Sequence, residues 1–111
     1  MFEDIKKKFF TQTLSELENL VVILENEPDG DQLDETVERI FTISHQICGT
    51  APILGYDLMP KLSRKVERAF YEVRNKKRDI SAQFLQQTRR TILSMIETLK
   101  EESKGITQVS N

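Results

Sequence analysis

The chain's only histidine, His45, lies in a stretch whose apolar residues recur every three or four positions, as on one face of a helix. Phe41 lies one turn before it, and Cys48 and Gly49 lie one turn after it. An imidazole beside a thiol could bind a metal ion or act as a nucleophile. Glycine costs a helix about 1 kcal/mol relative to alanine. Gly49 therefore indicates either space kept clear above the ring, or close approach of a neighbouring helix with His45 as an ordinary surface residue.

The other groups that these chemistries require are missing from the sequence. No second histidine and no second cysteine could complete a zinc site, so no metal is expected. A Cys–His nucleophile pair needs a pocket and an oxyanion hole, which a simple helical bundle rarely provides. No glycine-rich phosphate loop is present to hold a nucleotide. Cys48 is therefore expected to be small, inert and half-buried.

A surface histidine can still do chemistry when a partner supplies the rest of the site. Neutral imidazole predominates at about pH 7, which leaves one ring nitrogen free to attack a phosphoryl group. A kinase domain would bring ATP and Mg²⁺, and this chain would contribute only a positioned nucleophile. Such a carrier would bind no cofactor of its own, and it must expose its imidazole to two partners in turn.

Four amphipathic helices are expected to position these residues. They cover residues 2–26, from Asp31 or Asp34 to about Leu54, from a cap at Asp57 to about residue 74, and from a cap at Ser81 to about Lys100. Short connections make consecutive helices antiparallel, so the predicted fold is all-α, an up-down-up-down four-helix bundle. The composition becomes polar after Lys100, which predicts a bundle over residues 1–102 and a flexible tail or linker over residues 103–111.

The composition fits one helical domain, with 38% hydrophobic and 31% charged residues. No apolar run approaches the roughly 20 residues that a membrane span requires, and the N-terminal residues do not resemble a secretory signal. A single cysteine suits a reducing compartment. We therefore expect a cytoplasmic monomer without membrane contact.

The charges are unevenly distributed, although the net charge is only −2. Residues 1–40 hold 11 acidic and 4 basic residues, whereas residues 61–78 hold 8 basic and 2 acidic residues. The basic stretch could bind an acidic protein surface or nucleic acid, or it could be a solvated helix face offset by the acidic first helix. Nucleic acid is not expected as a partner, because aromatic residues are few and no binding motif is present.

The run from His45 to Gly55 resembles the motif of histidine phosphotransfer (HPt) domains, His-x-Leu-Lys-Gly-Ser-Ala-x-x-Leu-Gly. The positions that agree are His45, Ile47, Gly49, Ala51, Leu54 and Gly55, with Thr50 as a mild change from serine. The similarity continues through Tyr56, Leu58, Leu62, Val66 and Glu67, in the register of the N-terminal phosphotransfer domain of chemotaxis-type histidine kinases. It covers about residues 5–100.

The resemblance implies a role in a phosphorelay. His45 would accept a phosphoryl group from a histidine kinase catalytic domain and pass it to an aspartate of a response regulator receiver domain. Glu67 matches a glutamate that, in the chemotaxis subset, hydrogen-bonds Nδ1 and leaves Nε2 as the nucleophile; the alternative is an ordinary solvated glutamate. The residues expected to border the partner-binding surface are Phe41, Ile43, Cys48, Gly49, Pro52, Lys61 and Lys65.

One position departs from the family pattern. The lysine three residues after the histidine is Cys48 here, and a thiol does not neutralise a phosphoryl group. Arg64, one turn before Glu67, is the first candidate to replace that charge, with Lys61 and Lys65 as further candidates. Two other functions stay open. One is a degenerate HPt fold that docks a receiver or kinase without transfer, and the other is a helical adaptor whose basic third helix binds an acidic partner.

Overall fold

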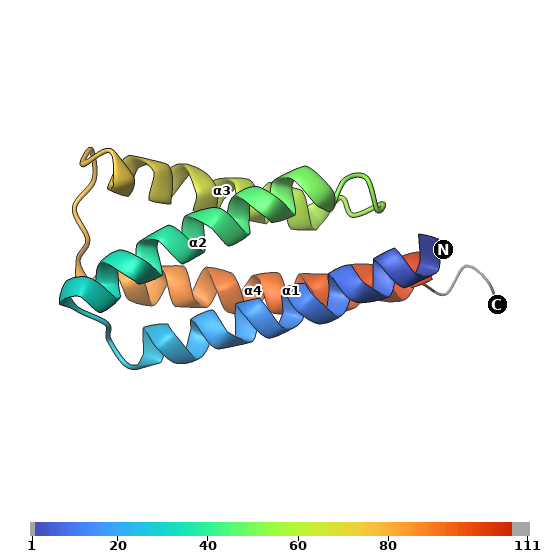
Figure 1. Ribbon diagram of the computed structural model, residues 1–111, viewed down its shortest axis with the longest axis horizontal. Helices are drawn as coiled ribbons and strands as arrows, with labels where there is room; N and C mark the ends of the chain where they lie inside the picture. The colour runs from blue at the N-terminus through green and yellow to red at the C-terminus, as the bar shows by residue number, and fades with distance from the viewer. Residues whose placement is uncertain (1, 108–111) are drawn as a thin grey trace.

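The computed structural model describes residues 2–107, which form four α-helices and no strand. The helices are α1 (Phe2–Glu25), α2 (Gly30–Thr50), α3 (Leu58–Arg74) and α4 (Ala82–Thr107). They alternate in direction, with α1 beside α4 and α2 beside α3 (Figure 1). The predicted all-α antiparallel four-helix bundle is therefore confirmed. No helix within the described residues is both long enough and apolar enough to cross a bilayer.

The core forms where the apolar faces of the four helices meet. Its members recur at three- and four-residue spacing on each helix, which puts them on one side. The largest fully buried apolar side chains are Leu17, Leu20, Leu24, Ile40, Met59, Phe70, Ile92, Met95 and Leu99. Burying a side chain of this size contributes about 1.5–3 kcal/mol relative to leaving it exposed. This core holds α2 and α3 together, and their outer faces remain exposed to solvent.

Helix α2 ends earlier than the sequence predicts, at Thr50 instead of about Leu54. Pro52 explains the difference, because its ring lacks an N–H and collides with the carbonyl four residues before it in a continuing helix. The chain then makes tight turns, in which the Leu54 and Tyr56 N–H groups donate to the Ala51 carbonyl at 3.1 and 3.0 Å. Gly55 takes a left-handed backbone conformation (φ +99°), which favours glycine.

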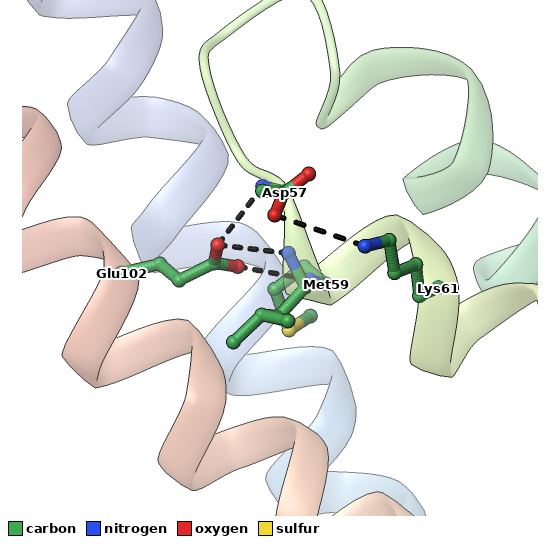
Figure 2. Close-up of polar contacts among 5 residues, drawn as sticks. Asp57, Met59, Lys61 and Glu102 are labelled. Atoms are coloured by element: carbon green, nitrogen blue, oxygen red, sulfur yellow. Dashed lines mark hydrogen bonds and ion pairs between the residues drawn. The ribbon is translucent and has the colours of Figure 1, made fainter.

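Helix α3 begins at Leu58 with Asp57 at the N-cap position, as predicted, but the expected capping hydrogen bond from its side chain is absent. The Asp57 side chain forms no capping hydrogen bond and instead lies 3.8 Å from the Lys61 ammonium group. The carboxylate of Glu102, on α4, accepts the N–H groups of Asp57 and Leu58 at 2.9 and 2.8 Å through Oε2, and that of Met59 at 2.8 Å through Oε1 (Figure 2). An anion at this position also suits the positive end of the helix dipole. The start of α3 is thus tied to the last turns of α4.

We expect Glu102→Ala to lower the free energy of unfolding by about 1–3 kcal/mol, because three N–H groups lose a charged acceptor. Urea unfolding followed by circular dichroism measures this loss. Glu101→Ala is the matched control, since Glu101 is 69% exposed and its one ion-pair partner within residues 2–107 is Lys104, at 3.6 Å. That change should stay within about 0.5 kcal/mol. Equal effects of the two substitutions would contradict the capping role.

Helix α4 starts as predicted, with the Phe84 N–H donating to Ser81 Oγ at 3.0 Å. The helix ends later than predicted, because residues 103–107 continue it and do not belong to a tail. Ser103 is buried, with its Oγ 2.6 Å from the Tyr56 hydroxyl, and Ile106 packs against the core. These two contacts stabilise a stretch whose polar composition suggested fraying. The rest of the predicted tail, residues 108–111, lies outside the described residues.

Candidate functional site

The side chains of His45 and Glu67 meet between α2 and α3. His45 Nδ1 lies 2.5 Å from Glu67 Oε2. Each side chain is carried by a regular helix, and the buried neighbours Ser44 and Val66 anchor the two backbones in the interior. The residue pair that the HPt resemblance implies is therefore in hydrogen-bond contact.

The two members of this pair differ sharply in exposure. The His45 side chain is 70% exposed, whereas that of Glu67 is 21% exposed. An ionised carboxylate only accepts hydrogen bonds, so in neutral imidazole the proton lies on Nδ1 and the lone pair lies on Nε2. Within residues 2–107, Nε2 takes part in no hydrogen bond. The arrangement thus presents a nucleophilic nitrogen to the solvent.

An aromatic ring lies beside the imidazole in a nearly parallel orientation. The rings of Phe41 and His45 have centroids 6.0 Å apart and are inclined by only 10°. The guanidinium carbon of Arg74 lies 4.3 Å from the Phe41 ring centroid, and Arg74 Nε donates to Glu38 Oε2 at 2.9 Å. Tyr71 also contacts Phe41, with centroids 6.3 Å apart. Glu38, Tyr71 and Arg74 were not among the residues predicted from the sequence.

These contacts form a regular series along α2 and α3. The facing pairs are Glu38 with Arg74, Phe41 with Tyr71, and His45 with Glu67. Successive pairs are three or four residues apart on each helix and run in opposite directions, as expected for one face of each of two antiparallel helices. The sequence shows this spacing on each helix, but only the packing of α2 against α3 shows which residues face one another.

Cys48 lies half-buried at the next step of this series, with its Sγ 3.8 Å from the Pro60 carbonyl oxygen. Burial, followed by the charge of Glu67 and a hydrogen bond to it, raises the pKa of the Cys48 thiol to about 11. The positive charge of Arg64 acts in the opposite direction. The thiol is therefore protonated and unreactive near neutral pH, as the sequence predicts.

We expect Cys48 to react with iodoacetamide at pH 8 about 100-fold more slowly than a thiol with the ordinary pKa of 9.0. Glu67→Gln should speed the reaction, because loss of a negative charge lowers the pKa of the thiol. Arg64→Gln should slow it, because the opposing positive charge is lost. Mass spectrometry of alkylation against time measures all three rates. Changes of the same sign in both variants would contradict this placement of the charges.

The three basic residues proposed to replace the family's lysine lie in different surroundings. Arg64 is exposed, and its positive charge lowers the pKa of the Cys48 thiol. Lys61 is held by Asp57 at the first turn of α3. Lys65 borders a cavity on the α4 side of α3, with Phe70 among the other lining residues. Arg64 therefore acts electrostatically on Cys48, whereas Lys65 lies on the α4 side of α3.

Three residues expected to border a partner surface also differ in position. Gly49 and Pro52 are exposed, and a Cβ added to Gly49 would meet no atom within 4 Å. The alternative that Gly49 admits a neighbouring helix is therefore wrong. Ile43 is 5% exposed and borders a groove of about 440 Å³ between α1 and α2. It belongs to the core face of α2 and not to the face that carries His45.

The two larger grooves of the described structure lie away from His45. The grooves between α1 and α2 and between α1 and α4, of about 440 and 700 Å³, are lined by neither His45 nor Glu67. Within residues 2–107, no three His, Cys, Asp or Glu side chains are grouped as metal ligands would be. The site consists of an oriented, exposed nucleophile.

No protein-family model, curated protein or solved structure matches this chain. The resemblance to HPt domains rests on the run from His45 to Gly55 and on the position of Glu67. The chemistry available to the chain follows from its own side chains, above all from the hydrogen bond between those two residues.

Proposed function

We propose that this chain is a histidine phosphotransfer domain of a two-component or chemotaxis-like relay. One observation carries the proposal: a 70% exposed imidazole whose Nδ1 lies 2.5 Å from a carboxylate oxygen. The carboxylate of Glu67 holds the Nδ1-protonated tautomer and turns the Nε2 lone pair outward. The chain resembles HPt domains over the same residues.

The proposed reaction needs only this nucleophile from the chain. Nε2 of His45 attacks the γ-phosphorus of ATP held with Mg²⁺ by a histidine kinase catalytic domain; the Nε2–P bond forms, the bridging P–O bond breaks, and ADP leaves. Glu67 accepts the Nδ1 hydrogen bond throughout and stabilises the positive charge that develops on the ring. A receiver aspartate then attacks the same phosphorus, and the Nε2–P bond breaks.

The surroundings of His45 suit a carrier that meets two partners. An imidazole on an open helix face can be reached by a kinase and by a receiver, whereas a deep pocket would admit neither domain. Gly49 leaves the surface one turn away without a side chain. Phe41, Cys48 and Pro52 are proposed to border the docking surface of a cytoplasmic monomer.

Arg64 is proposed to supply the positive charge that Cys48 does not. The Cys48 thiol remains neutral because its pKa is raised to about 11. Arg64 lies one turn before Glu67 and has no ion-pair partner among the described residues. Its guanidinium is thus available to a phosphoryl group, which it can bind through two parallel hydrogen bonds.

The test uses ATP labelled on its γ-phosphorus and purified kinases and receivers from the same genome. Acid-labile label on this chain, chased onto a receiver when the receiver is added, supports the relay. A second candidate is a docking module without transfer, which the neutral thiol at Cys48 favours. Receiver binding without any label would support that candidate and overturn the relay.

A further inference from the structure

We propose that Phe41 and Arg74 are positioning residues that fix the plane of the His45 ring. The effect on phosphotransfer rests on the proposed function, whereas the orientation of the ring depends only on contacts within this chain. The Phe41 ring lies nearly parallel to the imidazole, at an angle of 10°. Neither Phe41 nor Arg74 lies within the run that resembles the HPt motif.

Orientation of the imidazole requires more than the hydrogen bond to Glu67. The ring turns about two side-chain torsions, χ1 and χ2, and one hydrogen bond at Nδ1 does not fix both of them. A second contact reduces this freedom, and Phe41 supplies it one turn before His45 on the same helix, with its ring nearly parallel to the imidazole and the two centroids 6.0 Å apart. Together the two contacts determine where Nε2 points.

Phe41 is itself held from the α3 side. The Arg74 guanidinium lies 4.3 Å from the Phe41 ring centroid, a cation–π contact, and its Nε donates to Glu38 at 2.9 Å. Tyr71 contacts another part of the ring at 6.3 Å between centroids. Phe41 is only partly buried, so the core alone does not hold it. The order of support therefore runs from Glu38 to Arg74, then to Phe41, and then to His45.

A second cluster on the same chain resembles the one formed by Glu38, Phe41 and Arg74, and it provides a control for that cluster. Arg78 lies 5.4 Å from the Phe84 ring centroid and pairs with Glu72 at 2.8 Å. This cluster repeats the arrangement of a guanidinium, an aromatic ring and a carboxylate. Its ring, however, packs against Phe70 and not against His45. Arg78→Gln therefore removes the same types of contact without reaching the imidazole.

The first measurement is the proton distribution on the ring, read from long-range ¹H–¹⁵N NMR of the protein alone. Wild type should show the Nδ1-protonated tautomer. Phe41→Leu and Arg74→Gln should increase the proportion of the Nε2-protonated tautomer, whereas Arg78→Gln should not. Phe41→Tyr should restore the wild-type spectrum, because the aromatic ring is retained. Urea unfolding of each variant separates this effect from loss of the fold.

The second measurement is phosphorylation by phosphoramidate, a donor too small to need a docking surface. The Nε2–P bond forms, the P–N bond breaks, and ammonia leaves from the donor's already protonated nitrogen. Phe41→Leu should lower the rate about three- to tenfold, as expected for loss of an aromatic stacking contact. Arg74→Gln should lower it less, and Arg78→Gln not at all.

The two measurements separate the inference from the proposed function. An unchanged tautomer distribution and an unchanged rate in Phe41→Leu would overturn the positioning role. If wild type is phosphorylated neither by phosphoramidate nor by any kinase, the relay fails. The tautomer shift in Phe41→Leu would then still establish that the stack orients the ring.

Discussion

His45→Gln should abolish phosphorylation by any histidine kinase, with a loss of at least about 100-fold in rate. No other histidine exists in the chain, so no second imidazole can accept the phosphoryl group. An amide nitrogen is not nucleophilic, because its lone pair is delocalised into the carbonyl. Transfer of acid-labile label from ATP measures the loss.

The variant should also remain folded, which makes the result interpretable. The replaced side chain is 70% exposed, and surface substitutions usually change stability by no more than about 0.5 kcal/mol. Thermal unfolding of both proteins checks this expectation. Acid-labile label on a correctly folded His45→Gln protein would refute His45 as the acceptor.

Glu67→Ala should lower the phosphorylation rate by roughly 10- to 100-fold, by analogy with the loss of a carboxylate that orients a metal-bound histidine. The substitution deletes the acceptor 2.5 Å from Nδ1, so the ring loses both its preferred tautomer and the nearby negative charge. Glu67→Gln should fall between alanine and wild type, because its amide oxygen can still accept the Nδ1 hydrogen bond without the charge. Phosphoramidate kinetics give both rates.

Glu72→Ala is the matched control for the role of Glu67. Both glutamates lie on α3 and both have side-chain partners, but Glu72 pairs with Arg78 and not with His45. Its substitution should leave the phosphorylation rate unchanged. Equal losses from the two substitutions would assign the effect to the stability of α3 or to the overall negative charge.

The helices themselves could be predicted because their apolar spacing is a local property. The differences arise where a distant residue or a single ring decides the outcome. Pro52 ends α2 early through its own geometry, which the amphipathic pattern does not include. Glu102 caps α3 from 45 residues away, and no local pattern pairs it with Asp57. The polar sequence around Ser103 predicts a tail, and only the fold brings Tyr56 beside this residue.

The candidate site could be predicted only as far as the motif extends. His45 is conspicuous as a lone histidine, and Glu67 was expected from the HPt register; the structure places the two in contact. Glu38, Tyr71 and Arg74 share the three- and four-residue spacing of that pair, but many other residues of two amphipathic helices share it too. Choosing among them requires the lateral alignment of α2 with α3, which depends on how the whole core packs.

Gly49 carries a consequence for the evolution of this surface. It is the penultimate residue of α2, where glycine lowers helical stability relative to alanine by up to about 1 kcal/mol, and within the described residues no atom lies where its Cβ would be. Folding alone would therefore allow mutational drift toward alanine at this position. On the proposed function, the selection that opposes this drift acts through the partners: a small part of the chain's own stability has been given up to leave room for other proteins.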